Sequence, residues 1–228
     1  MNKNDITSSR AYIFDYGGTL DTGGCHWGKV LWHAWQQAGV PADELLFREA
    51  YVYAERSLAR NVEIQPDFTF RQTLDAKLRL ELDYVGCLEY RERVLDVVYQ
   101  QTLRHTAHSV AVLRQLAARA PLALVTNFYG NIHAVLDEMG FSGLFRHVVE
   151  SAVVGVRKPD PRIFSLGVEA LGVPAADVVV VGDSIGKDIL PARSIGCKTI
   201  WLRGEQWTAE PVDETIPDAV IADLQELV

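Results

Sequence analysis

The chain has 228 residues, of which 48% are hydrophobic, and its formal net charge is −8. This length suits one core domain with an insertion, and the hydrophobic content is that of a folded chain rather than a disordered one. The acidic balance argues against nucleic acid or an anionic membrane as a partner, because both are bound by basic surfaces. It permits small anionic substrates, because a bound divalent cation reverses the local field.

The three cysteines, Cys25, Cys87 and Cys197, are far apart and form no C-x-x-C pair. This arrangement argues against a disulfide framework and against a structural zinc site. The first residues are polar, and no apolar run approaches the ~20 residues that a membrane span requires. We therefore expect a cytoplasmic protein.

The first expected strand is Ala11–Phe14, an apolar run that stops at Asp15 and is followed by two glycines. From residue 22 to residue 105, apolar residues recur only at helical spacing, which predicts an inserted, all-helical domain. The helices expected in this insert are Trp27–Ala38, Asp43–Arg60, Phe68–Leu82 and Leu88–Leu103.

Beyond the insert, strands and helices alternate. The expected strands are Leu122–Thr126, His147–Ser151, Val178–Val181 and Lys198–Leu202. The expected helices are Ser109–Arg119, Ile132–Met139, Pro161–Leu171 and Lys187–Ile195. This alternation predicts a mostly parallel sheet covered on both faces, so we expect residues 1–21 and 106–228 to form a Rossmann-like, doubly wound α/β core.

Polar residues directly follow three of the expected strands, at Asp15, at Thr126–Asn127 and at Asp183. Ligands of such sheets bind outside the carboxyl ends of the strands, so these positions are expected to meet at one site. Asp15 suits a nucleophile that attacks phosphorus, and Gly17 and Gly18 let backbone N–H groups approach a phosphate. Taken alone, this motif is equally compatible with a turn aspartate.

Two other segments carry groups that suit a phosphoryl ligand. Thr126 can donate its hydroxyl to a phosphate oxygen, although helix capping is the alternative for this residue type. Lys158 precedes Pro159, which disfavours a helix at Lys158 and places its ammonium on a loop, where it can neutralise a phosphoryl group and a carboxylate. A solvated surface lysine is the alternative.

The fourth segment, Val178–Asp188, contains Asp183 and Asp188 after a run of four valines. Carboxylates placed just past a buried strand suit a hard cation. Mg²⁺ keeps several waters and takes one or two carboxylates plus phosphate, a count that Asp15 and Asp183 meet.

In this order the four segments resemble the four motifs of the haloacid dehalogenase (HAD) superfamily of hydrolases. The RKPDP and GDSxxxD stretches are the most specific, and the resemblance covers about residues 8–21 and 106–228. Some 111 residues separate Asp15 from Thr126, against 32 between Thr126 and Lys158. The insert therefore resembles the helical cap of the C1 group.

The resemblance implies a role for each matching residue. Asp15 is the nucleophile and binds Mg²⁺ with Asp183 and the backbone carbonyl of Gly17. The residues implied to bind the phosphate or the substrate are Thr126, Lys158, Gly18 and, on the substrate side, Asn127. Asp188 is implied to orient Lys158 and a metal-bound water.

One position departs from the family's phosphatases, which carry an acid/base aspartate where this chain has Gly17. General acid–base catalysis is worth ~10²–10⁴ in rate, so its loss handicaps alkyl phosphates more than acyl or aryl phosphates, which leave without protonation. Asp21 or His26 could replace the missing group, although a turn residue and a helix-start residue are the stronger interpretations.

The sequence thus predicts a Mg²⁺-dependent phosphatase that acts on a small phosphorylated metabolite through an aspartyl-phosphate. The alternatives are a phosphonatase-like enzyme that cleaves a P–C bond, and a phosphate-binding protein without turnover. Phosphonatases use a cap lysine, but neither Lys29 nor Lys77 has a context that matches it. A dehalogenase is disfavoured because Asp183 and Asp188 are both present.

Overall fold

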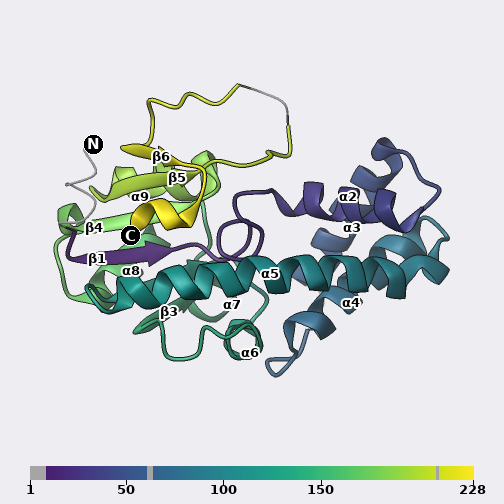
Figure 1. The fold of residues 1–228 in the computed structure, drawn as a ribbon, viewed down its shortest axis with the longest axis horizontal. Helices are drawn as coiled ribbons and strands as arrows, with labels where there is room; N and C mark the ends of the chain where they lie inside the picture. The colour runs from purple at the N-terminus through teal and green to yellow at the C-terminus, as the bar shows by residue number, and fades with distance from the viewer. Residues whose placement is uncertain (1–8, 61–63, 209–210) are drawn as a thin grey trace.

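The computed structural model describes residues 9–60, 64–208 and 211–228 (Figure 1). Its centre is a parallel sheet in the order β3-β2-β1-β4-β5-β6. The strands are β1 (Ala11–Phe14), β2 (Leu122–Thr126), β3 (His147–Glu150), β4 (Val178–Gly182), β5 (Lys198–Leu202) and β6 (Ala219–Ile221). On one side of the sheet β2 and β3 follow β1, and on the other side β5 and β6 follow β4, which confirms the predicted doubly wound α/β core. The topological switch point lies between β1 and β4.

The helices form two groups (Figure 1). Beyond the end of the sheet lie α2 (Trp27–Ala38), α3 (Glu44–Arg60), α4 (Phe70–Tyr84) and the first part of α5 (Arg91–Ala117). Around the sheet lie the rest of α5, α6 (Ile132–Glu138), α7 (Ser151–Val154), α8 (Arg162–Leu171) and α9 (Leu190–Ser194). Short helical turns are η1 (Leu88–Tyr90), η2 (Ala175–Asp177), η3 (Ile185–Ile189) and η4 (Leu224–Leu227).

The long helix α5 differs from the expectation of separate helices at Leu88–Leu103 and Ser109–Arg119. Residues 104–108 contain no glycine or proline, so nothing in them interrupts the helix. The predicted boundary between 22–105 and 106–228 therefore falls inside one continuous element. That division of the chain stays a prediction, and residues 1–8, 61–63 and 209–210 within it lie outside the described residues.

Apolar residues of β1 point alternately to the two faces of the sheet, as the strand period requires. Tyr12 and Phe14 belong to a buried cluster that includes Leu113 of α5, whereas Ala11 and Ile13 belong to a second cluster on the α8 side. The first cluster continues through α2 and α4, so the helical insert and the sheet share one hydrophobic core. Within the described ranges, no helix is both long and apolar enough to cross a membrane.

Candidate active site

Three strand ends converge at the switch point of the sheet. Asp15 follows β1, and its N–H continues the ladder by donating to Val181 O over 3.0 Å. Thr126 closes β2 and Asp183 follows β4, the two strands that flank β1. All three of these polar residues are buried, and all line one cavity of about 680 Å³. The topology therefore brings together the residues that the sequence placed at strand ends.

Lys158 reaches this point from the loop before α8. Its Nζ contacts Asp15 Oδ1 and lies 2.7 Å from Asp188 Oδ1. Burial by itself lowers the pKa of Lys158, but Asp15 and Asp188 outweigh burial and raise this pKa above its usual value. The ammonium is therefore held charged between two carboxylates.

Asn127 fixes the backbone from which Lys158 extends. Its Nδ2 donates to Lys158 O over 3.0 Å, and its Oδ1 accepts from Lys158 N over 2.9 Å. Asn127 lines the cavity, as the substrate-side expectation requires, but its amide is engaged in this two-bond clamp. Its evident role is to place the lysine.

Three carboxylates at the site form a candidate metal centre. One oxygen from each of Asp15, Asp183 and Asp188 lies within 4.8 Å of the others. Burial raises the pKa of Asp183 well above its usual value, and the charges of Asp15 and Asp188 raise it further. Burial likewise raises the pKa of Asp188, to about 6. Such a crowded, buried acidic cluster fits a hard divalent cation, which would offset the repulsion between the carboxylates.

Thr19 connects Asp15 to Asp183, and no sequence motif indicated it. Its hydroxyl lies 3.0 Å from Asp15 Oδ2 and 3.1 Å from Asp183 Oδ1, and it accepts from Asp183 N over 3.0 Å. The fully buried threonine thus holds the ends of β1 and β4 together. Its position four residues after Asp15, next to a glycine pair, was the available signal.

The space beside Gly17 is occupied by an indole. A Cβ atom built on Gly17 would lie 3.6 Å from Nε1 of Trp27. That Nε1 donates to Asp21 Oδ2 over 3.0 Å, and Gly18 N donates to Asp21 Oδ1 over 2.8 Å. The Gly18 N–H that we expected to face a phosphate is thus engaged by Asp21. Burial raises the pKa of Asp21 to about 8.

His26 begins helix α2, as expected. Its Nδ1 accepts from Gly28 N over 3.0 Å, so a neutral ring carries its proton on Nε2. Burial lowers the pKa of His26 to about 4, which keeps the ring neutral. His26 lines the cavity, where its remaining N–H is a potential donor.

The wall opposite the strand ends comes from the insert. Its helices α3 and α4 contribute Tyr51, Glu55, Phe70, Thr73, Leu74 and Lys77 to the cavity. Trp32 and Trp35 instead pack on Phe47 in the core of the insert.

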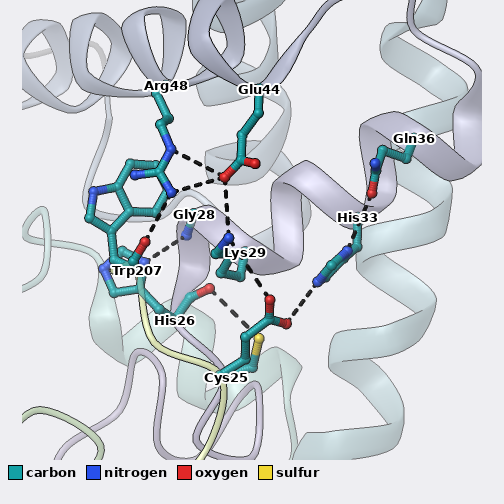
Figure 2. A network of polar contacts seen from close by, with 10 residues as sticks. Cys25, His26, Gly28, Lys29, His33, Gln36, Glu44, Arg48 and Trp207 are labelled. Atoms are coloured by element: carbon teal, nitrogen blue, oxygen red, sulfur yellow. Dashed lines mark hydrogen bonds and ion pairs between the residues drawn. The ribbon is translucent and has the colours of Figure 1, made fainter. Parts of the chain in front are cut away.

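A loop between β5 and β6 completes the wall, and no sequence pattern indicated it. Figure 2 shows Trp207 of this loop lying against α2 and α3. The guanidinium of Arg48 lies 4.2 Å from the Trp207 ring centre and donates to Trp207 O over 3.0 Å. The neighbouring Glu205 accepts from His26 N over 2.8 Å and contacts His33 over 2.7 Å. The loop is thus bound to the insert by several contacts.

Comparison with known proteins assigns the chain to a family. Residues 10–196 match the model of the haloacid dehalogenase-like hydrolases. A phosphoserine phosphatase of Thermus thermophilus is 26% identical over 212 residues, which cover 88% of this chain and 76% of that protein. Haloacid dehalogenase-like hydrolase domain-containing protein 3 of Danio rerio is 36% identical over 104 residues, 46% of this chain and 43% of the relative. The chain thus spans less than half of that second relative.

Solved structures show the same architecture. The L-2-haloacid dehalogenase RSc1362 aligns with a TM-score of 0.58 and 26% identity, covering 96% of this chain and 97% of that one. A HAD phosphatase from Thermococcus onnurineus aligns with a TM-score of 0.55 and 22% identity, covering 96% and 95%. Since dehalogenases and phosphatases both align, the fold does not separate these two reactions.

Proposed function

We propose that this chain, which belongs to the haloacid dehalogenase-like hydrolases, is a Mg²⁺-dependent phosphatase of small phosphorylated metabolites. The observation that carries the proposal is the buried cluster of Asp15, Lys158, Asp183 and Asp188 at the floor of one cavity. A nucleophilic carboxylate, a fixed ammonium and a candidate cation site are the parts that phosphoryl transfer requires.

Each residue of the cluster has its own role in the proposed reaction. Asp15 attacks phosphorus in line with the leaving oxygen and becomes an aspartyl-phosphate, which water then hydrolyses. Lys158 neutralises charge on the phosphoryl oxygens, and Asp188 holds that ammonium in place. Thr126 offers its hydroxyl to a phosphoryl oxygen. Asp15, Asp183 and the Gly17 carbonyl would hold Mg²⁺, which supplies electrostatic stabilisation of the transferring group when bound.

The group that would protonate the leaving oxygen is missing from position 17. The nearest group to that position is the Trp27 indole, whose N–H can donate a hydrogen bond but is too weak an acid to protonate a leaving oxygen. Asp21 lines the cavity, but its two carboxyl oxygens already accept hydrogen bonds from Trp27 Nε1 and Gly18 N. We therefore propose that activity is higher on acyl and aryl phosphates than on alkyl phosphates.

A phosphatase screen tests the proposal. With Mg²⁺ present, the protein should hydrolyse acetyl phosphate and p-nitrophenyl phosphate, and EDTA should abolish the activity. Asp15→Asn should lower kcat by at least about a thousandfold, because it removes the nucleophile. Phosphate release in a colorimetric assay measures both effects. A protein that binds Mg²⁺ and phosphate analogues but hydrolyses none of the substrates would instead be a binding protein without turnover.

P–C bond cleavage is the second candidate, because Lys77 of the insert lines the cavity. A lysine that forms a Schiff base must lose its proton. Burial lowers the pKa of Lys77, but its ion pair with Glu55 outweighs burial and raises this pKa well above its usual value. The charged state of Lys77 argues against this reaction, and the release of acetaldehyde from phosphonoacetaldehyde would overturn that argument.

A further inference from the structure

Aromatic rings from both parts of the molecule line the cavity that contains Asp15. They lie in three pairs: Trp27 with Phe70, Tyr51 with Trp207, and Phe128 with Tyr129. The ring centres within these pairs are 5.8, 5.1 and 5.2 Å apart, which is the spacing of aromatic rings in contact. All of these residues except Phe70 are partly exposed, so the cavity wall presents ring surface to a ligand.

Trp27 lies where a leaving group begins. In an in-line displacement the leaving oxygen lies opposite Asp15, and a group that protonates it would extend from position 17. The space beside Gly17 holds the Trp27 indole instead, because a Cβ atom there would lie 3.6 Å from Nε1. The hydrogen bond of 3.0 Å from this Nε1 to Asp21 fixes the orientation of the ring. A leaving group therefore meets an aromatic surface where an acid would stand.

The charged groups of the same cavity do not call for a charged leaving group. Burial raises the pKa of Glu55, but its ion pair with Lys77 outweighs burial, and Lys187 lowers this pKa further. Glu55 is therefore ionised and already has two cations near it. Three further charged groups line the cavity but are exposed, so water solvates them; these are Arg157, Lys187 and Asp213.

The other titratable groups around the rings are mainly uncharged at pH 7. Burial raises the pKa values of Tyr51 and Tyr129 well above their usual value, and it raises that of Asp21 to about 8. Burial lowers the pKa of His26 to about 4. Burial thus favours the neutral form of each group, and a neutral aromatic body can pack among them without taking a counter-ion from any charge of the wall.

An aryl leaving group satisfies both features of the cavity. An aryl oxide leaves without protonation, which suits the missing acid, and its ring can stack on the rings of the wall, a contact worth about two- to tenfold in affinity. A small acyl group also leaves without protonation but offers no ring. We propose that Trp27 and its neighbouring rings form a leaving-group pocket for aryl phosphates, an inference that rests on the proposed phosphatase function.

The proposed step is balanced without an acid from the protein. A carboxylate oxygen of Asp15 forms a bond to phosphorus while the bond from phosphorus to the aryl oxygen breaks. The aryl oxide departs with the bonding electron pair, and water protonates it after release. The rings contribute by binding the aryl group, so their effect is expected in kcat/KM.

Two aryl esters test the pocket in the presence of Mg²⁺. Phenyl phosphate and 2-naphthyl phosphate release alcohols of similar acidity, so they differ mainly in the area of the ring. The cavity, about 680 Å³ in volume, has room for either ring. We expect kcat/KM on 2-naphthyl phosphate to be higher by at least about tenfold, because more apolar surface is buried and more ring is stacked. Equal values, or a lower one on 2-naphthyl phosphate, overturn the pocket.

Two substitutions of Trp27 separate the ring from its hydrogen bond. Trp27→Leu and Trp27→Phe both lose the bond from Nε1 to Asp21, but only the second keeps a ring. The preference for 2-naphthyl over phenyl phosphate should fall to about threefold or less in Trp27→Leu and persist in Trp27→Phe. An equal preference in the two variants overturns the role of the ring. If Trp27→Leu does not fold, Phe128→Leu replaces it, with the same expected fall.

Trp32→Leu is the matched control. Trp32 lies on the same helix as Trp27 and is likewise partly buried, but it packs on Phe47 and is not among the cavity-lining residues. Its preference for 2-naphthyl phosphate should equal that of the unmodified protein. A fall as large as that in Trp27→Leu would show that the preference depends on packing of the insert, which overturns the pocket.

Activity on acetyl phosphate separates the pocket from the proposed function. If acetyl phosphate is hydrolysed and neither aryl ester is, the phosphatase function stands and the pocket is overturned. If none of the three is hydrolysed, the phosphatase function fails, and binding decides the pocket. Calorimetry with Asp15→Asn and Mg²⁺ then compares the two aryl esters. A Kd at least about tenfold lower for 2-naphthyl phosphate supports the pocket, and equal Kd values overturn it.

Discussion

Two adjacent glycines of the site are subject to different constraints. Gly18 has a φ of 98°, and a Cβ atom there would lie 2.5 Å from the carboxylate of Asp183, so both backbone and space require glycine. Gly17 has no such restriction. A Cβ atom at Gly17 would make only an ordinary contact of 3.6 Å with Trp27 Nε1. Position 17 therefore accommodates a Cβ atom, and a longer side chain there would lie against the Trp27 indole.

Gly17→Asp should increase kcat on glycerol 3-phosphate by up to about a hundredfold, because it adds a carboxyl group that can protonate the leaving alkoxide. The rate on acetyl phosphate should change little, since its leaving group needs no proton. Steady-state kinetics on the two substrates give the comparison. Gly17→Asn is the control, because it has the same shape but no acid function. A gain in the Asn variant, or none in the Asp variant on any alkyl phosphate, would refute the argument.

The site residues at strand ends could be predicted from the sequence because a strand and its following polar residue are local features. Asp15 and Asp183 are of this kind. The clamp made by Asn127 and the bridge made by Thr19 could not be predicted, because each joins distant parts of the chain. Asn127 and Lys158 are 31 positions apart, and Thr19 and Asp183 are 164 positions apart. Polarity and spacing identified Asn127 as a candidate but not Thr19, and only the folded geometry shows which group each of these side chains contacts.

The loop after β5 was not indicated by any sequence pattern, yet its residues make several contacts with the helical insert. Strands and helices were predictable where apolar periodicity ended at proline or glycine. The three-residue strand β6 and this loop lack such periodicity. The side chain of Trp207 packs so closely on Gly28 that a Cβ atom there would lie 2.0 Å from the indole. We infer that this loop limits how far the helical insert can move from the sheet.

Trp207→Ala should loosen the insert. The variant loses the packing on Gly28 and the cation–π contact with Arg48, and we expect a loss of about 2 kcal/mol, or a fall in Tm of about 4–8 °C for a domain of this size. Amide exchange in α2 and α3 should become faster, as measured by mass spectrometry. Gln206→Ala is the stability control, because its side chain makes one long hydrogen bond, 3.3 Å to Gly204 O. Unchanged exchange in both helices would contradict the role of the loop.

For the molecule as a whole, several buried carboxyl groups make folding dependent on pH. Burial raises the pKa values of Asp21, Asp183, Asp188 and Glu81. For Asp183 and Asp188, which lie in the candidate metal centre, a bound cation would offset this effect. Glu81 lies in the insert, and within the described residues neither of its carboxyl oxygens has a hydrogen-bond partner. Its effect on the pH dependence of stability can therefore be measured separately from that of the candidate metal centre.

Stability should fall as pH rises from about 4.5 to about 8, the interval between the usual pKa of Glu81 and its value in the folded protein. In this interval the unfolded chain has released the proton that the folded protein still binds, so each pH unit lowers the free energy of unfolding by up to about 1.4 kcal/mol. Glu81→Gln removes this contribution, on the order of 4 kcal/mol across the interval.

Urea unfolding at pH 5 and pH 8 measures the effect. The quantity compared is the difference in the free energy of unfolding between the unmodified protein and Glu81→Gln. The unmodified protein should lose stability relative to Glu81→Gln as the pH rises. Glu89→Gln, at an exposed glutamate, should follow the unmodified protein at both values. If the difference between the unmodified protein and Glu81→Gln is the same at pH 5 and pH 8, Glu81 is not protonated in the folded state.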